Sequence, residues 1–223
     1  MRRVVLFDVN ETLLDFHYLD PLFETHFGDA GLLPAWFAQM IQITFVGVIT
    51  GHHVDFTSAQ RAAVQVLAAR RGIELSTVAV EEIVGAVSEL PPHPDVPAGL
   101  EALRSAGHRL GTLTNSPLAV VQEQMRRAGL TGHFDMILSA EEAGRLKPAA
   151  EAYRYGAAQF GVSTSGVRLV AAHAWDTAGA LAAGCAAAFV GRPGAVPTPL
   201  GEQPDISGRD ILAVAELIIE AER

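Results

Sequence analysis

Charged side chains stand at the ends of several short, mostly apolar segments of the sequence. Asp8 directly follows the run Val4–Phe7, and Asp176 lies just beyond a second run, Val167–Ala171. Lys147 precedes a proline between these two positions. Where such groups meet, a nearby ammonium keeps a carboxylate ionised and oriented, and an oriented carboxylate is a competent nucleophile. These residue types therefore predict covalent chemistry at Asp8.

Lys147 is the only lysine among the 16 basic residues, and all the others are arginines. A single lysine in that background indicates a site that needs a compact ammonium, where a planar guanidinium would not fit. We expect Lys147 beside Asp8, with Asp176 holding the ammonium in place. On strand position alone, a structural ion pair that caps the sheet would explain Asp8 equally well.

A parallel sheet would bring these side chains together, because ligands of such sheets bind at the carboxyl ends of the strands. The apolar runs predict strands at Val4–Phe7, Arg109–Thr114, Phe134–Leu138, Val167–Ala171 and Ala187–Val190. Helical periodicity predicts helices at Ala98–Ala106, Pro117–Ala128, Pro148–Phe160, Thr177–Ala183 and Asp210–Ala221. This alternation predicts an α/β fold with a doubly wound, Rossmann-like parallel sheet and helices on both faces.

A block of helical periodicity separates the first strand from the rest. It predicts helices at Asp20–Phe27, Leu33–Thr50, Thr57–Arg71 and Thr77–Leu90. The run Pro-Pro-His-Pro at 91–94 then breaks the pattern. We therefore expect an α/β core domain of residues 1–15 and 91–223, with residues 16–90 inserted as a helical cap. The Pro- and Gly-rich segment 191–208 is predicted to be a loop.

The composition limits the classes of partner. The formal net charge of −9 argues against nucleic acid or an anionic membrane as the main partner. The single cysteine, Cys185, cannot form an internal disulfide, and the apolar start of the chain is too short for an export signal. We therefore expect a cytoplasmic protein, with Cys185 as a buried apolar residue.

Residues 31–51 carry no charge and are about long enough to span a bilayer. Polar residues, a proline and a glycine interrupt this segment. We expect a helix buried at a subdomain or subunit interface, compatible with a homodimer, and no membrane span.

Four ordered motifs resemble those of the haloacid dehalogenase-like superfamily. They are Phe-Asp-Val-Asn-Glu-Thr-Leu-Leu-Asp around Asp8, Leu-Thr-Asn-Ser at 113–116, Lys147-Pro148, and His-Ala-Trp-Asp at 173–176. A helical cap lies between the first two, and the resemblance covers essentially the whole chain. It implies a hydrolase that forms a covalent ester at Asp8.

Two positions depart from the phosphatases of that superfamily. Asn10 stands where they resemble one another in having an aspartate as general acid and base, and an amide cannot exchange a proton near neutral pH. Ala172 replaces an aspartate of their Mg²⁺ site, which leaves Asp8 and Asp176 as a poor ligand set beside Lys147. We therefore expect metal-free, cofactor-free chemistry, with Asn10 in contact with the substrate.

Thr-Asn in the second motif and Ala-Trp-Asp in the fourth resemble the L-2-haloacid dehalogenases (haloacid dehalogenase type II). The resemblance implies an enzyme acting on carbon–halide bonds of a small (S)-2-haloacid, in which Asp8 displaces halide and water then cleaves the ester. It also implies the substrate-binding residues: Thr114 for the carboxylate, Asn115 for the halide, and Trp175, Phe56 and Ile41 for an apolar wall. Tyr153 would form a hydrogen bond near the site or serve in packing.

His173 and Glu11 suggest how the ester is hydrolysed. A histidine near a carboxylate is a plausible general base, so we expect Glu11 to orient His173 and His173 to activate water. A polar pair that merely lines the cleft is the alternative.

One departure concerns the leaving group. Phe37 stands where the resemblance implies a cap arginine on the halide, and the role of His52 and His53 nearby stays open. Two other functions compete: a phosphatase or phosphonatase of the same superfamily, and a weakly catalytic protein that binds a small acid. The missing cap arginine supports the second of these.

Overall fold

The computed structural model describes residues 2–52 and 54–223, which form two compact units. One unit comprises Met1–Asp15 and Pro92–Arg223, and the other comprises Phe16–Pro91. The boundary falls one residue later than the sequence predicts, because Pro92 already pairs with Leu14 of the core in a short bridge. The position of one unit relative to the other is not determined, so each is described by itself.

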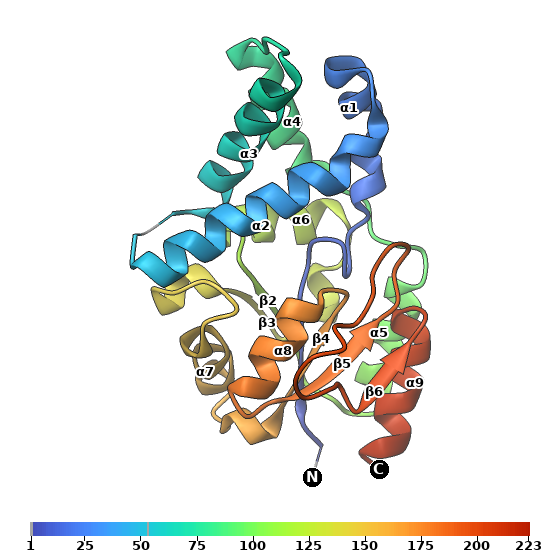
Figure 1. Ribbon diagram of the computed structural model, residues 1–223. Coiled ribbons are helices and arrows are strands. Elements are labelled where there is room, and N and C mark those ends of the chain that lie inside the picture. Colours follow the sequence, from blue (N-terminus) through green and yellow to red (C-terminus); the bar gives the residue numbers. More distant parts are fainter. Residues whose placement is uncertain (1, 53) are drawn as a thin grey trace. The chain divides into compact units, whose positions relative to one another are not determined.

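The core unit is built on a parallel sheet with the strand order β3-β2-β1-β4-β5-β6 (Figure 1). The strands are β1 (Val4–Phe7), β2 (Leu110–Thr114), β3 (Met136–Ser139), β4 (Val167–Ala171), β5 (Ala186–Val190) and β6 (Ile206–Gly208). Every residue of β1, β2 and β4 is buried, as expected for central strands covered on both faces. The order runs outward from β1 in both directions, which is the doubly wound arrangement that the sequence predicts.

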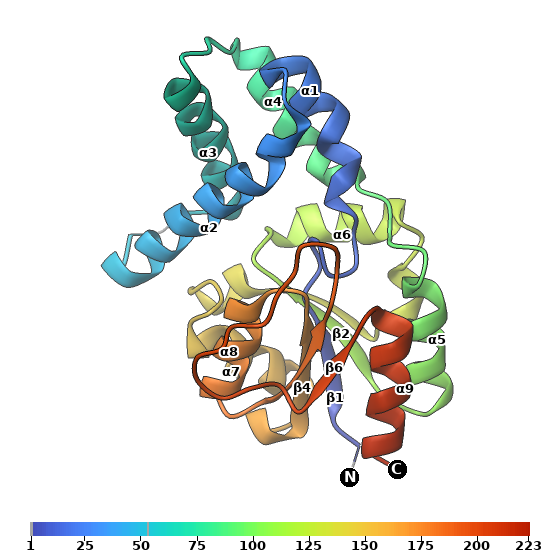
Figure 2. The ribbon, with the colours of Figure 1, turned by 45° about the vertical axis from the view of Figure 1, so that its right-hand side comes forward.

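Helices cover both faces of this sheet. Helices α5 and α9 pack against each other on one face, and α7 and α8 lie on the other, while α6 contacts β3 (Figures 1 and 2). Their bounds are α5 (Val96–Ser105), α6 (Leu118–Arg127), α7 (Ala150–Gln159), α8 (Ala174–Ala182) and α9 (Ile211–Ala221). Gly99 permits the close contact of α5 with α9, since a Cβ there would lie 2.7 Å from the Ile211 side chain. Short 3-10 turns occur at Thr131–His133, Ala140–Ala143 and Thr164–Gly166.

The segment 191–208 is not entirely a loop, so that prediction was wrong at its end. Ile206–Gly208 forms the edge strand β6, which pairs with β5 in the register Ala188↔Ile206 to Val190↔Gly208. A three-residue strand after a Pro- and Gly-rich stretch leaves no alternating pattern in the sequence. The strand β6 forms because it pairs with β5, and not because its residues have a high strand propensity.

The cap unit consists of α1 (Asp20–Phe27), α2 (Leu33–Thr50), α3 (Phe56–Arg71) and α4 (Thr77–Ala86), with 3-10 turns at Phe16–Leu19, Ala30–Leu32 and Val87–Glu89. Side-chain caps begin two of these helices. Asp55 accepts a hydrogen bond from Ser58 N at 2.8 Å, and Ser76 accepts one from Ala79 N at 3.2 Å. The Trp36 indole donates to the backbone oxygen of Gln60 at 3.1 Å and so ties α2 to α3.

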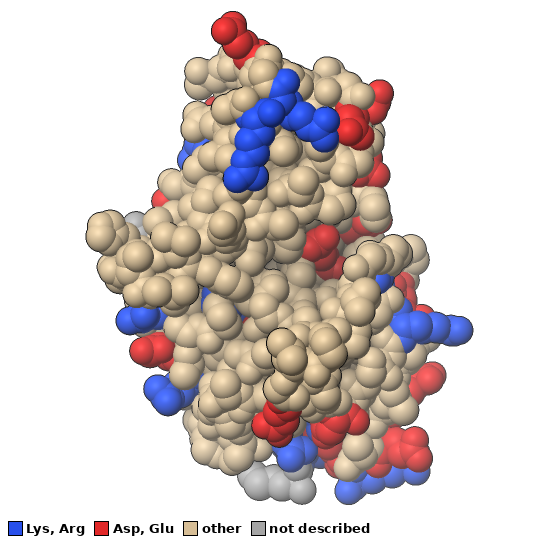
Figure 3. Space-filling model, viewed as in Figure 1, with Lys and Arg blue, Asp and Glu red and all other residues tan. Residues whose placement is uncertain are grey.

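Helix α2 carries the apolar segment noted in the sequence. Within the described residues, Ala30–Thr50 is the one helical segment long and apolar enough to cross a membrane, and 44% of an 18-residue stretch of it is buried inside the protein. No Asp, Glu, Lys or Arg occurs between residues 31 and 54, and the surface along α2 is accordingly almost uncharged (Figure 3). Val46 and Ile49 are exposed on it. A homodimer contact and the absence of a membrane span both stay predictions.

Candidate active site

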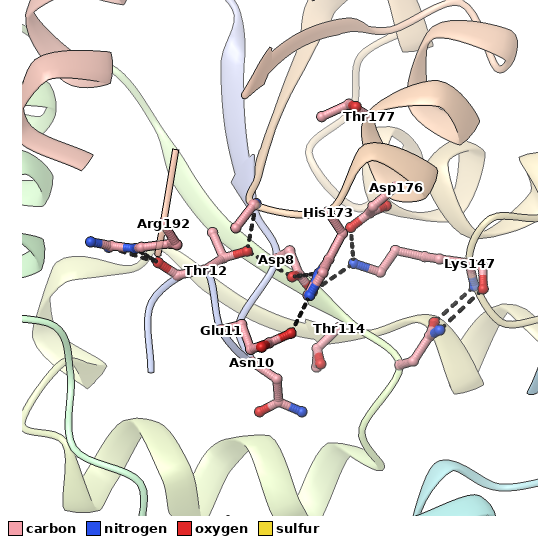
Figure 4. A network of polar contacts seen from close by, with 12 residues as sticks. Asp8, Asn10, Glu11, Thr12, Thr114, Lys147, His173, Asp176, Thr177 and Arg192 are labelled. Carbon is pink, nitrogen blue, oxygen red and sulfur yellow. Dashed lines mark hydrogen bonds and ion pairs between the residues drawn. The ribbon is translucent and has the colours of Figure 1, made fainter. Parts of the chain in front are cut away.

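Two loops and the start of a helix bring the predicted charged residues together at the carboxyl ends of the strands (Figure 4). Asp8 follows β1, Lys147 lies between β3 and α7, and Asp176 stands in the first turn of α8, after β4. Asp8 is 4% exposed, and Lys147 and Asp176 are completely buried. The parallel order of the strands is what makes residues so far apart in the sequence neighbours.

The Lys147 ammonium lies between the two carboxylates. Its Nζ donates to Asp8 Oδ1 at 2.9 Å and to Asp176 Oδ2 at 2.5 Å. The Tyr153 hydroxyl donates to the other oxygen of Asp176, Oδ1, at 2.7 Å. Asp176 therefore holds Lys147 as expected, and Tyr153 has a polar role in this support in addition to packing.

Charge in this cluster fixes the ionisation of the nucleophile. Burial alone would raise the pKa of the Asp8 carboxyl, but the charge of Lys147 and the hydrogen bond from His173 outweigh burial and hold this pKa well below its usual range. Burial alone would lower the pKa of Lys147, yet the charges of Asp176 and Asp8 raise it instead. Asp8 is thus a carboxylate, and Lys147 an ammonium, at neutral pH.

The two oxygens of Asp8 have different surroundings. Oδ2 accepts a hydrogen bond from the Thr12 hydroxyl at 2.8 Å and lies 3.0 Å from His173 Nδ1. Oδ1 accepts from Lys147, its one hydrogen-bond donor within the described part of the chain. Oδ1 therefore keeps a lone pair for attack on a substrate, whereas both lone pairs of Oδ2 face donors.

His173 bridges two carboxylates. Its Nδ1 faces Asp8, and its Nε2 lies 2.7 Å from Glu11 Oε2. A neutral imidazole carries one N–H, so only the imidazolium donates to both carboxylates at once. Burial would lower the pKa of His173, but the hydrogen bonds to Asp8 and Glu11 raise it to about 10. His173 is therefore a cation at neutral pH while Asp8 is ionised, which the sequence alone did not indicate.

Glu11 reaches His173 from an unusual backbone conformation. Its φ of 59° lies in the left-handed region of backbone conformation, which residues other than glycine adopt at a cost of about 1 kcal/mol or more. A glutamate that tolerates this strain in contact with His173 supports a role for the pair beyond lining the cleft.

The second motif supports Lys147 through its backbone. Asn115 Nδ2 donates to Lys147 O at 3.1 Å, and Lys147 N donates to Asn115 Oδ1 at 2.8 Å. The second hydrogen on Nδ2 is the one that would serve the predicted halide contact. Thr114, which is 1% exposed, accepts from Ser116 N at 3.2 Å, so its hydroxyl hydrogen is available to a substrate carboxylate.

Asn10 forms hydrogen bonds within the protein, and its predicted contact with the substrate stays a prediction. Its Nδ2 donates to Ser116 Oγ at 3.2 Å, and its Oδ1 accepts from Gln124 of α6 at 3.0 Å. Figure 4 shows the amide directed away from Asp8. These hydrogen bonds join the first motif to the second motif and to α6, where Gln124 is completely buried. The sequence could not reveal the direction in which the amide points.

The residues predicted to form the apolar wall lie in both units. Trp175 stacks on the His173 ring, with centroids 5.3 Å apart, and its own ring centroid lies 5.8 Å from Lys147 Nζ. Ile41 and Phe56 belong to α2 and α3 of the cap, so their contact with a substrate stays a prediction.

Phe37 and Cys185 pack within their own units. The Phe37 ring packs on Phe16 of the cap at 5.5 Å. Cys185 is buried, and burial raises the pKa of its thiol to about 12, which suits a packing residue rather than a nucleophile. His52 follows the end of α2, and His53 lies outside the described residues.

Thr12 is a further residue of the site, which the sequence did not reveal. It is fully buried, donates to Asp8 and accepts a hydrogen bond from Ala172 N at 2.9 Å. The sequence signal for this contact was a residue with a hydroxyl group four positions after Asp8. The contact itself depends on how the loop closes.

A family model described as haloacid dehalogenase-like hydrolase matches residues 2–184 of this chain. The chain belongs to this family. The resemblance drawn from the motifs is thereby confirmed, and so are the α/β fold and the assignment as a hydrolase.

Individual members resemble this haloacid dehalogenase-like hydrolase over nearly its whole length. Haloacetate dehalogenase H-2 of Moraxella sp. (strain B) is 26% identical over 218 residues, 97% of each chain. The (S)-2-haloacid dehalogenase of Pseudomonas sp. (strain YL) is 26% identical over 215 residues, 96% of this chain and 93% of that protein. The fold is shared with L-2-haloacid dehalogenase from Xanthobacter autotrophicus, solved with chloropropionic acid covalently bound, at a TM-score of 0.89, 22% identity and 98% coverage of each chain.

The site does not fit the Mg²⁺ that the family's phosphatases use. Mg²⁺ requires several hard oxygen ligands in octahedral geometry. Here the oxygens of Asp8 face Lys147, Thr12 and His173, and those of Asp176 face Lys147 and Tyr153. Two cationic side chains thus lie where a divalent ion would have to approach Asp8.

The bridging His173 predicts a pH-dependent stability. Its pKa is raised on folding, so its stabilisation is complete below the ordinary histidine pKa of about 6.5 and is lost as the pH rises to about 10. We expect the free energy of unfolding to fall by a few kcal/mol between these values, because raising a pKa by one corresponds to about 1.4 kcal/mol. Urea unfolding across this range measures it.

A His173→Gln variant should lack most of this slope, whereas His108→Gln, which alters another buried histidine, should keep it. The same slope in wild type and His173→Gln would contradict the assigned charge.

Proposed function

We propose that this protein is a metal-free 2-haloacid dehalogenase, selective for the (S)-enantiomer, that works through an Asp8 ester. The observation that carries the proposal is the Asp8 carboxylate itself. It is buried, ionised beside Lys147 and His173, and has one oxygen with a free lone pair. The haloacetate and (S)-2-haloacid dehalogenases that are 26% identical over nearly the full length support it.

In the first step, Asp8 Oδ1 attacks the carbon that bears the halogen. The new carbon–oxygen bond forms as the carbon–halogen bond breaks, and the halide leaves with the bonding electron pair. Attack opposite to the leaving group inverts that carbon. Lys147 keeps Asp8 ionised throughout, and the surrounding low-dielectric site leaves the carboxylate little water to shed before it reacts.

Substrate binding follows from the groups around Asp8. The Thr114 hydroxyl would hold the substrate carboxylate, helped by the backbone N–H groups that open α6. Asn115 would donate its remaining amide hydrogen to the halide, and Trp175 would cover the alkyl group. Ile41 and Phe56 of the cap would complete the apolar wall.

In the second step, ester formation itself prepares His173. The ester at Asp8 carries no charge, so the imidazolium loses one of its two carboxylate partners and releases its proton more easily. That proton and the halide together are the acid that the overall reaction produces. The neutral ring, still held at Nε2 by Glu11, can then act as the base.

Hydrolysis then restores the resting site. Water attacks the Asp8 carbonyl carbon while His173 Nδ1 accepts its proton, and Thr12 donates to the oxygen on which negative charge develops. The hydroxy acid leaves with a proton, Asp8 returns as a carboxylate, and His173 is again an imidazolium. No metal takes part in any step.

Two observations weigh against a phosphatase or phosphonatase. The Asn10 amide forms hydrogen bonds with Ser116 and Gln124, and an amide cannot transfer a proton to a leaving group as a general acid does. Ala172 supplies no metal ligand.

Phe37 in place of the expected cap arginine is the one feature that favours a weakly catalytic binding protein. An oriented nucleophile with a hydrolytic base beside it argues against that reading.

Halide release without added metal tests the proposed function. The substrates are chloro-, bromo- and fluoroacetate and both 2-chloropropionate enantiomers, in the presence of EDTA. We expect equal amounts of halide and hydroxy acid, preference for (S)-2-chloropropionate and inversion to (R)-lactate. Asp8→Asn provides the inactive control.

No halide from any of these substrates would refute the proposal. Mg²⁺-dependent phosphate release from a phosphate monoester would favour the phosphatase instead.

A His173→Ala variant tests the second step. Asp8 should still be alkylated, because Lys147 still keeps it ionised, but the ester should persist and the turnover rate should fall by about 10²- to 10⁴-fold, as expected when a general base is lost. Mass spectrometry of the Asp8 peptide detects the adduct. His108→Ala, which removes a buried histidine bonded to Arg3 O, should accumulate none. Unimpaired turnover of His173→Ala would exclude His173 as the base.

A further inference from the structure

The loop that follows β1 and carries the nucleophile, residues 8–13, is called the nucleophile loop. The backbone carbonyls of its last three residues, Glu11, Thr12 and Leu13, each accept hydrogen bonds from residues far away in the sequence. His93 donates to Glu11 O from Nε2 at 3.2 Å and to Leu13 O from its backbone N–H at 2.9 Å. Arg192 donates to Thr12 O from Nε at 3.1 Å and from Nη2 at 2.8 Å. Two hydrogen bonds from one guanidinium thus fix the orientation of the Thr12 peptide group.

Arg192 is itself held rigidly. It follows β5 and is 8% exposed. Its Nη1 donates to Asp95 Oδ1 at 2.7 Å, and the second oxygen of Asp95 accepts from Ile211 N, also at 2.7 Å, at the start of α9. The guanidinium therefore joins the nucleophile loop to α5 and α9 (Figure 4 shows its contact with Thr12).

Thr12 connects this support to the nucleophile. Its carbonyl accepts from Arg192, while its hydroxyl donates to Asp8 Oδ2 at 2.8 Å. Threonine is β-branched, so its side-chain torsion is restricted and the hydroxyl follows the backbone. A displacement of the backbone at Thr12 would therefore move the hydroxyl away from Asp8.

We propose that Arg192 is a positioning residue for Asp8: by fixing Thr12, it keeps one carboxylate oxygen occupied and leaves Oδ1 as the attacking atom. This inference rests on the proposed function, since it concerns the rate of ester formation. Arg192 acts through Thr12, so its loss should slow the attack of Asp8 and leave substrate binding nearly unchanged.

A double-mutant cycle of Arg192→Met and Thr12→Val tests this connection. Methionine keeps an apolar stem without the donors, and valine keeps the shape of threonine without the hydroxyl. Each single variant should slow ester formation in a single turnover about 10- to 100-fold, as misplaced reactive groups do, with KM changed less than about twofold. The double variant should be no slower than the slower single variant, because both changes break one connection.

Arg168→Met is the matched control. Arg168 is 1% exposed and bound to Glu222 Oε1 at 2.9 Å, to Ala187 O at 3.1 Å and to Asp205, so it loses comparable contacts. Among the described residues, it forms no hydrogen bond or ion pair with the nucleophile loop. Its variant should melt at a lower temperature but form the ester within about twofold of the wild-type rate, and it should combine additively with Thr12→Val.

A second readout needs no substrate. In an NMR titration, loss of the Thr12 hydrogen bond should raise the pKa of the His173 ring in Arg192→Met and in Thr12→Val, because His173 then remains as the donor to Asp8 Oδ2. The two effects should not add in the double variant, and Arg168→Met should leave the pKa unchanged. Failure of wild type to form any ester would refute the proposed function, and the titration cycle would then decide the role of Arg192 alone.

Additive effects of Arg192→Met and Thr12→Val in both readouts would overturn the proposal, as would an Arg192→Met protein that behaves like Arg168→Met. If Arg192→Met does not fold, Asp95→Asn takes its place in the cycle. It keeps the guanidinium but weakens its anchor, and the same non-additivity with Thr12→Val is expected.

Discussion

The ammonium of Lys147, buried between the carboxylates of Asp8 and Asp176, is the interaction on which the rest of the site depends. Removing one partner of such a buried cluster leaves an uncompensated charge, at a cost of about 3–5 kcal/mol. The three segments that follow β1, β3 and β4 must therefore meet in one geometry. The hydrogen bonds of Asn115 to the Lys147 backbone and of Tyr153 to Asp176 serve this requirement.

A second cation distinguishes this site from a metal-dependent one. His173 lies between Asp8 and Glu11, so two positive groups face the nucleophile from within the protein. In the proposed mechanism, neutralisation of Asp8 by the substrate changes the charge balance around His173. The same ring then serves first as a counter-ion and afterwards as a base. The order of the two steps thus follows from the charges, with no conformational change required in the core.

The sequence predicted those features that depend on local pattern and on strand order. Helix α2 begins and ends at the predicted residues because a proline stands in its first turn and Gly51 follows its end. Asp8, Lys147 and Asp176 could be placed together because each follows a strand of one parallel sheet. Features set by packing escaped prediction: the direction of the Asn10 amide depends on Gln124 of α6, and the contact of Arg192 with Thr12 spans 180 positions. The charge of His173 likewise required both carboxylate distances.

The central claim, that Asp8 becomes covalently bonded to the substrate, is tested most directly by the fate of solvent oxygen. A single turnover with enzyme in excess, carried out in H₂¹⁸O, should yield hydroxy acid whose new hydroxyl carries ¹⁶O from Asp8. The Asp8 peptide should gain one ¹⁸O, because water attacks its carbonyl carbon. A product that carries ¹⁸O in its new hydroxyl after the first turnover, with an unlabelled Asp8, would show that water displaces the halide directly and would contradict the account.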